Sequence, residues 1–165
     1  MTSIRNVLAI AASTCSLCVA AAESPSEFEL SIVLTDKGSA IFDTWDRPTG
    51  KPFDVSGIKI AQRGKFLSAL LMFKGCAADA SGNCSADVDI IAYDPKGNVY
   101  GKMIGVELWQ NKPAPSAGFT QLSRSYMGLM IEAKDPIGTY RITAVARDRN
   151  GKREARAEAT FQVGM

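Results

Sequence analysis

The sequence has 165 residues, enough for one domain or for one domain plus a targeting segment, and its 46% hydrophobic content excludes a wholly disordered chain. It contains no histidine, which excludes Ser-His-Asp and Cys-His nucleophiles and every histidine-ligated metal or haem site. With 19 basic and 17 acidic residues the net charge is only +2, so we predict no nucleic-acid partner.

The N-terminal segment predicts a secretory signal peptide. Arg5 is the only charged residue before Glu23, and the stretch between them is mostly apolar. It ends at Ala20–Ala22, which satisfies the small-x-small requirement of signal peptidase. A membrane anchor is the alternative, but the apolar run is shorter than the ~20 residues of a spanning helix and contains hydroxyl side chains. We therefore expect a cleaved signal over 1–22 and one domain without a membrane span over 23–165, located in the periplasm or secreted.

The segments that follow read as strands and turns, and none shows a helical period of adequate length. Residues 28–35 alternate between apolar and polar side chains, which predicts a strand with one buried face. Residues 65–74 are apolar on both faces, which predicts a strand covered on both sides. The other expected elements are strands over 87–93, within 99–109 (one or two) and over 125–131, turns over 94–97 and 135–138, and Pro-rich loops over 46–56 and 110–118.

Two cysteines remain after the predicted cleavage, Cys76 and Cys84, eight residues apart. In an exported protein such a pair favours a structural disulfide, and the C-x-x-C spacing of most redox pairs is absent. Three side chains of the intervening loop also offer oxygen ligands for calcium: Asp79, Ser81 and Asn83. The glycine of this loop comes too early for the calcium-loop pattern, so we expect no metal and no other cofactor.

The last two strands allow a sharper prediction, because Asn150-Gly151 is the favoured pair for a two-residue type I′ hairpin turn. That turn places Ala146 opposite Ala155 and Arg147 opposite Glu154. One face of the hairpin is then apolar and the other carries opposite charges.

Seven or eight short strands separated by turn signals, without alternating helices, are typical of an all-β protein. We expect a single antiparallel β-sandwich, with a β-barrel as the alternative architecture.

The segment from 135 onwards, with Gly138 and Tyr140 in a Gly-x-Tyr pattern, resembles the final two strands of immunoglobulin-like domains in bacterial envelope proteins. The stretch 73–100, with its cysteine loop, is similar to a group of exported proteobacterial proteins of uncharacterised function. The resemblance covers about 45–163 and implies an immunoglobulin-like β-sandwich. In that fold Tyr140 would be the tyrosine corner, bonding back to the preceding loop. The motifs are structural, so they imply no catalytic residue.

Carboxylates are the first candidates for chemistry. Asp87 and Asp89 lie two apart on one strand face, and Asp94 follows. Such groups can act in acid–base catalysis if burial raises a pKa, as in glycan hydrolases. A solvated strand face beside buried Val88 and Ile90 is the interpretation that we favour.

Methionines are the second candidates, because thioethers bind copper in some periplasmic β-sandwiches. The methionines beyond the signal are Met72, Met103, Met127, Met130 and Met165. Met127 and Met130 would point to opposite faces of one strand, which favours a packing role over a metal site.

Aromatic and basic residues complete the candidates. Trp45 and Trp109 each adjoin a polar loop, where an exposed indole can serve as a binding platform or plug the core instead. Basic residues gather at the final hairpin with acidic residues among them, which favours an ion-paired surface over an anion site. They are Arg141, Arg147, Arg149, Lys152, Arg153 and Arg156.

The sequence as a whole favours an exported, non-catalytic module that binds a protein or another envelope component. The alternatives are a carboxylate-based glycan hydrolase and a methionine-type periplasmic metal carrier. The oligomeric state stays open, because an exposed edge strand could pair with itself.

Overall fold

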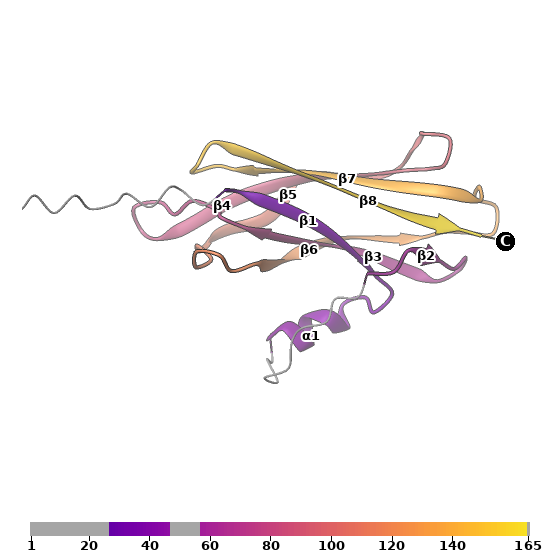
Figure 1. The fold of residues 1–165 in the computed structure, drawn as a ribbon, viewed down its shortest axis with the longest axis horizontal. Coiled ribbons are helices and arrows are strands. Elements are labelled where there is room, and N and C mark those ends of the chain that lie inside the picture. Colours follow the sequence, from indigo (N-terminus) through magenta and orange to yellow (C-terminus); the bar gives the residue numbers. More distant parts are fainter. Residues whose placement is uncertain (1–26, 47–56, 165) are drawn as a thin grey trace, which may run out of the picture.

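The computed structural model describes residues 27–46 and 57–164 (Figure 1). The predicted signal peptide, nearly all of the predicted loop over 46–56 and Met165 lie outside the described residues.

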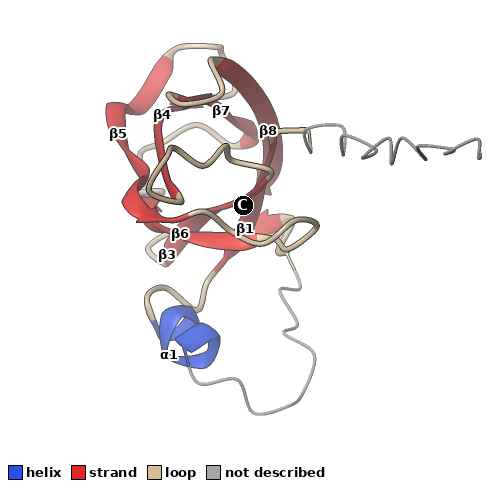
Figure 2. Cartoon of the chain, turned by 90° about the vertical axis from the view of Figure 1, so that its left-hand side faces the viewer, coloured by secondary structure: helices blue, strands red, loops and turns tan. Residues whose placement is uncertain are grey.

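The described chain contains eight strands in two sheets, ordered β1-β3-β6 and β2-β8-β7-β4-β5. Their bounds are β1 Glu29–Thr35, β2 Ile60–Ala61, β3 Phe66–Lys74, β4 Asn83–Tyr93, β5 Val99–Pro113, β6 Gln121–Met130, β7 Gly138–Asp148 and β8 Arg153–Val163. All neighbouring strands are antiparallel except β2 and β8, which pair in parallel. Figure 2 shows the two layers nearly end-on. Because no hydrogen-bonded strand pair joins the two sheets in the described chain, the fold is an immunoglobulin-like β-sandwich and not a closed barrel.

The core lies between the two sheets and is built from alternate residues of each strand. On β3 the inward residues include Leu67, Leu71 and Phe73, and on β7 they include Tyr140 and Ile142, all nearly inaccessible to solvent. Burying one such side chain contributes about 1.5–3 kcal/mol, so the period-2 pattern read from the sequence supplies most of the driving force.

A short helix, α1 (Ala40–Asp46), was not expected from the sequence. It lies against the outer face of the three-stranded sheet (Figure 1), where Ile41 packs with Leu70 and Leu122. The Phe42 ring lies 5.7 Å from that of Tyr126. The helix therefore explains why β3 is apolar on both faces, as the sequence indicated.

Strand β5 is longer than predicted, because it runs unbroken from Val99 through Pro113 and takes in the first four residues of the expected loop over 110–118. The sequence was misleading here because β5 is an edge strand. An edge strand tolerates polar side chains and a proline, which has no N–H to donate.

The β7–β8 hairpin has the predicted register, with Ala146 opposite Ala155 and Arg147 opposite Glu154. The predicted type I′ turn at Asn150-Gly151 is wrong: the strands end at Asp148 and Arg153, and positive φ occurs at Lys152 (51°) and at neither residue of that pair. The Asp148 side chain accepts a hydrogen bond from the Gly151 N–H (3.0 Å) and so holds a four-residue loop. A four-residue loop centred on the same pair gives the same strand register as the two-residue turn. The predicted register is therefore correct although the predicted turn type is wrong.

The two other predicted turns had different outcomes. The turn over 94–97 is present, with the Gly97 N–H bonded to the Asp94 carbonyl (2.9 Å). The second turn lies over 132–135 and not over 135–138, because Asp135 bonds back to Glu132 through both its backbone N–H and its side chain. Gly138 instead begins β7, at φ 133° and close to Pro95.

Candidate functional site

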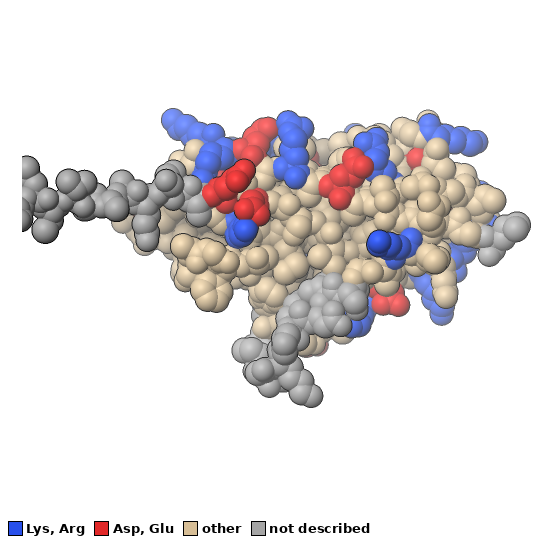
Figure 3. All heavy atoms as spheres, viewed as in Figure 1, with Lys and Arg blue, Asp and Glu red and all other residues tan. Residues whose placement is uncertain are grey.

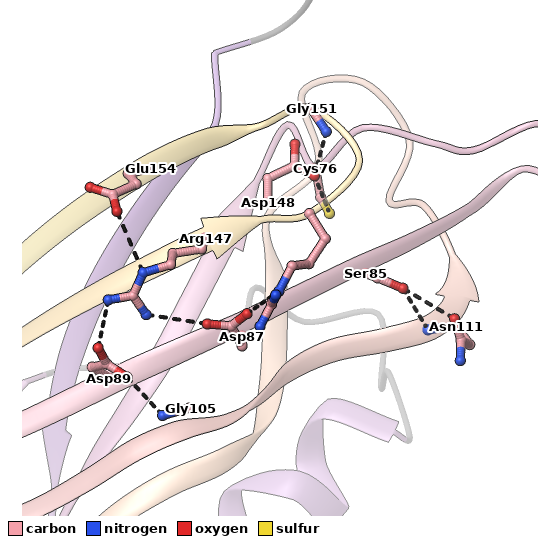
Figure 4. Close-up of polar contacts among 11 residues, drawn as sticks. Cys76, Ser85, Asp87, Asp89, Gly105, Asn111, Arg147, Asp148, Gly151 and Glu154 are labelled. Carbon is pink, nitrogen blue, oxygen red and sulfur yellow. Dashed lines mark hydrogen bonds and ion pairs between the residues drawn. The ribbon is translucent and has the colours of Figure 1, made fainter.

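The outer face of the five-stranded sheet carries a charged cluster centred on Arg147 (Figure 4). Its guanidinium Nη2 lies 2.6 Å from Asp89 Oδ2, Nη1 lies 3.2 Å from Asp87 Oδ1, and Nε lies 3.4 Å from Glu154 Oε1. Asp87 and Glu154 are the cross-strand neighbours of Arg147 on β4 and β8. The alternation of each strand therefore brings all four side chains to one face.

Both carboxylates of β4 are fully engaged in this cluster. Asp87 also pairs with Arg149, and Asp89 accepts a hydrogen bond from the Gly105 N–H (2.7 Å). The hydrogen bond from Arg147 holds the pKa of Asp89 below its usual value, and these acidic partners raise the pKa of Arg147. A general acid of a glycan hydrolase needs a raised carboxyl pKa, so this arrangement favours permanent ion pairs over proton transfer.

Asp94, the third carboxylate candidate, organises the β4–β5 turn. Its Oδ1 accepts hydrogen bonds from the backbone N–H groups of Lys96 and Asn98, both at 2.8 Å, and the Asn98 side chain lowers its pKa.

Asp79 repeats the same construction before β4, within an Asp-x-x-Gly-Asn pattern that both loops share. Its Oδ1 accepts from the N–H groups of Ser81 and Asn83, and Gly82 and Gly97 have φ of 82° and 84°. Two of the oxygen atoms considered for calcium, Asp79 Oδ1 and Ser81 Oγ, are thus used in hydrogen bonds within the loop. Across residues 27–46 and 57–164, no group of three or more His, Cys, Asp or Glu side chains is placed to hold a metal ion.

The disulfide Cys76–Cys84 is present, with its Cα atoms 6.0 Å apart. Beside it lies Asp148, which is 1% exposed and accepts hydrogen bonds from the Ala77 N–H (3.0 Å) and the Arg153 guanidinium (2.7 Å). Together with the Gly151 N–H, these contacts form what we call the Asp148 junction, which ties the disulfide loop to the β7–β8 hairpin. The sequence carried a signal for it, because the alternation of β7 places Asp148 on the inward face.

Tyr140 is completely buried and its hydroxyl donates a hydrogen bond to the Pro136 carbonyl (2.9 Å), the contact expected of a tyrosine corner. Its ring stacks on Phe161 and meets Tyr100 edge-on.

Both tryptophans are partly buried. Trp109 packs on Phe73, donates its indole N–H to the Pro113 carbonyl (3.1 Å), and has the Lys112 ammonium 5.1 Å from its ring centre. Trp45, on α1, packs against the apolar cluster beneath that helix. A role for either one in ligand binding stays a prediction.

The methionines lie in different environments. Met127 is buried in the core, whereas Met130, three residues later, is half-exposed on the opposite face. Met72 packs in the cluster under α1, and Met103 packs at the core margin.

Exposed apolar side chains gather at one end of the sandwich, a feature that the sequence did not reveal. Five of the seven large apolar side chains that are exposed in the described chain lie at this end. Phe66, Val99 and Ile137 lie at or just before the starts of β3, β5 and β7, Met130 ends β6, and Ile60 is in β2. We call this the apolar end; it consists of Ile60, Phe66, Val99, Met130 and Ile137.

The register supports this grouping. Phe66 pairs with Met130 across β3 and β6, and the Tyr100 hydroxyl beside Val99 donates to the Met130 carbonyl (2.8 Å). An open pocket at the same end is lined by residues of β2 and β3, including Ile60 and Phe66, and by the exposed side chains of Asp36 and Lys65.

Comparison with known proteins finds no matching family model and no similar curated protein. Several solved structures are similar in fold. The CARDB domain of the PF1109 protein from Pyrococcus furiosus, described in complex with di-metal ions, is 13% identical over 84% of this chain and 88% of that one (TM-score 0.42). The alkylpurine DNA glycosylase AlkC of Pseudomonas fluorescens, bound to DNA with an abasic-site analog, is 13% identical over 85% of this chain and 31% of its own (TM-score 0.43).

A family 123 glycoside hydrolase from Clostridium perfringens is 7% identical over 82% of this chain and 27% of its own (TM-score 0.39). These likenesses concern the fold and are too distant to assign a function. The strand order itself defines the class of this chain, an immunoglobulin-like β-sandwich module. Within the residues that the structure describes, no helix has the length and hydropathy needed to cross a membrane.

Proposed function

We propose that this chain is an exported, non-catalytic binding module that holds a protein partner at the apolar end. The observation that carries the proposal is the gathering of Ile60, Phe66, Val99, Met130 and Ile137 at one end. Exposed apolar groups are ordinary when scattered, but a gathered set is typical of an interaction site. In a β-sandwich, the ends carry the loops that most often bind.

The charges beside the apolar end are of both signs. Exposed Lys59 and Lys65 adjoin Ile60 and Phe66 in sequence, and exposed Lys96 lies in the turn before Val99, whereas exposed Asp36 lines the same pocket as Ile60 and Phe66. An apolar protein surface with a rim of mixed charge would complement this arrangement, because a polar rim with charge complementarity sets orientation and association rate.

Export to the periplasm or the cell exterior is part of the same proposal. The sequence of 1–22 has the features of a signal peptide, and the Cys76–Cys84 disulfide suits an oxidising compartment. Cell fractionation with mass spectrometry of the N-terminus tests this. We expect a periplasmic or secreted protein beginning at Glu23, and an intact cytoplasmic chain would contradict it.

The binding proposal is tested by crosslinked capture from the native envelope, followed by affinity measurement with the purified partner. The variant Ile60→Ser/Phe66→Ser/Ile137→Ser removes three anchors of the apolar end. We expect its affinity to fall at least about tenfold, because a few buried anchors carry most of the binding energy.

The matched control is Phe119→Ser, since Phe119 is as exposed as Ile60 (70% each) but lies in the β5–β6 loop at the other end. This variant should bind as the wild type does. Equal binding by the triple variant and the wild type would overturn the proposal, as would loss of binding in the control alone.

A further inference from the structure

The outer edge of β8 lacks a backbone partner over most of its length in the described chain. On that side β2 pairs only with Gln162 and Val163. The Gln162 N–H donates to the Lys59 carbonyl (2.8 Å), so the backbone of Gln162 points outward from the sheet. Because β7 and β8 pair without a bulge, every second residue before it points outward too, namely Glu154, Arg156, Glu158 and Thr160.

Two features that often prevent strands from pairing, proline and β-bulges, are absent from residues 153–160 of this edge. The opposite edge of the sheet, β5, has register shifts against β4, positive φ at Gly105 and Asn111, and Pro113 at its end. Residues 153–160 of β8 contain no proline, glycine or positive φ. Among the described residues, the edge of β8 from Arg153 to Thr160 therefore has no bulge and no bonded backbone partner, which suits the addition of another strand.

The boundary between β8 and β1, where the two sheets meet, leaves apolar side chains only partly buried. Leu30 and Ile32 of β1 and Ala157 and Ala159 of β8 belong to the inward-facing sets of their strands, yet each is only partly buried. Figure 3, in which β1 and β8 lie towards the viewer, shows charged side chains along the upper margin and a largely uncharged band below them. A strand added to β8 would cover these apolar groups.

We propose that the occupant of this edge is a second copy of the chain, with β8 paired antiparallel to β8 about a twofold axis. The charge pattern carries this inference. When Arg156 lies opposite Glu158 of the partner copy, the twofold axis repeats the pair, and Glu154 lies opposite Thr160. Alanines then meet alanines on the inner face, and every outward N–H and C=O from Glu154 to Thr160 gains a partner.

Neighbouring registers are less suitable. A shift of two residues in one direction places Arg156 opposite Arg156. The opposite shift of two residues places Glu158 opposite Glu158. A shift of four residues in the first direction pairs Glu154 with Arg156 but carries Lys152, whose φ is 51°, into the pairing zone. The free edge thus selects one register, which continues the two five-stranded sheets across the interface. This inference is independent of the proposed function, because residues 153–160 lie outside the apolar end.

Sedimentation equilibrium of the mature protein tests the pairing. We expect a reversible dimer, weakened at least about tenfold by Arg156→Glu or by Glu158→Arg, since each places like charges opposite each other twice. The double variant Arg156→Glu/Glu158→Arg restores both pairs and should dimerise within about threefold of the wild type. An equimolar mixture of the two single variants should form a heterodimer, which also verifies that each variant is folded.

Hydrogen exchange of individual backbone amides tests the same strand pairing residue by residue. The amides of Arg156 and Glu158 should exchange slowly only in the dimer, whereas that of Ala157, bonded to β7, should be protected in both states. A protein that stays monomeric up to about 1 mM would overturn the inference. A dimer that is insensitive to Glu158→Arg, or is not rescued by the double variant, would overturn it equally.

Discussion

Asp148 is the side chain on which the packing of the disulfide loop against the last hairpin depends. Its carboxylate is 1% exposed and accepts from Ala77, Gly151 and Arg153. In Asp148→Ala these donors lose their acceptor inside the protein, and Arg153 loses its buried counter-charge. We expect the free energy of unfolding to fall by about 3 kcal/mol, measured by urea denaturation.

Glu154→Ala is the matched control, because Glu154 also pairs with an arginine of the hairpin but is half-exposed. We expect it to cost less than about 1 kcal/mol. Equal losses in the two variants would contradict the role assigned to burial at the Asp148 junction.

Asp89 gives a prediction about pH. Its pKa is lowered in the folded protein by the hydrogen bond from Arg147, so it releases its proton more readily folded than unfolded. Its stabilising contribution is therefore present above the unfolded pKa of about 3.9 and is lost as the pH falls through the folded value. Asp89→Asn should lower the free energy of unfolding by about 1 kcal/mol at pH 7.

The difference between Asp89→Asn and the wild type should then shrink as the pH falls below the unfolded pKa of about 3.9 and through the lower folded pKa of Asp89. Parallel urea titrations at pH 7, 5 and 3 measure it. A difference that is constant with pH would show that the Asp89 charge does not contribute.

Single residues were predictable from sequence where a local pattern determined the contact. Tyr140 bonds to Pro136 four residues earlier, and the cysteines lie in one short loop. Of the partners of Asp148, Gly151 and Arg153 lie in the same hairpin, and the predicted register already sets Arg153 opposite Asp148. Ala77 lies 71 residues away, so only the fold could reveal that contact. The same holds for Arg147, whose charge was recognised but whose bonds to Asp87 and Asp89 were not.

Among the larger elements, the disulfide loop between β3 and β4 gives a direct stability prediction. Cys76→Ser/Cys84→Ser removes a cross-link that closes a loop of about nine residues, which by the chain-entropy relation costs about 2–3 kcal/mol. Chemical denaturation of this variant and of the wild type, each with and without reductant, measures it. Reductant should destabilise only the wild type, and a loss in the variant well below 1 kcal/mol would contradict the prediction.

Elements were predicted best where alternation and burial agree. Strands β1, β7 and β8 each combine a period-2 pattern with an apolar inner face, and β3 is a continuous apolar run, so the presence of these strands and the hairpin register could be read from the sequence. Helix α1 spans only seven residues and is held by contacts with β3 and β6, which no local period reveals. The full length of β5 escaped prediction because backbone pairing with β4 defines an edge strand more than hydrophobicity does.

For the molecule as a whole, the class of fold followed from strand spacing, but the candidate binding surface did not. The apolar end consists of residues from distant parts of the sequence, which the strand arrangement brings to one end of the sandwich; they are Ile60, Phe66, Val99, Met130 and Ile137. The apolar end and the β8 edge occupy different parts of the sandwich. In a dimer with antiparallel β8 strands, the two apolar ends would point in opposite directions and could each hold a partner.

The measurement that tests the binding proposal most directly is methyl NMR of residues 23–165, titrated with the captured partner. Ile60, Met130 and Ile137 report on the apolar end, and Ile104, which is 57% exposed in the middle of β5, is the internal control. We predict large shift changes at the three apolar-end methyls and none at Ile104. Changes at Ile104, or binding that leaves the three methyls unmoved, would contradict the account.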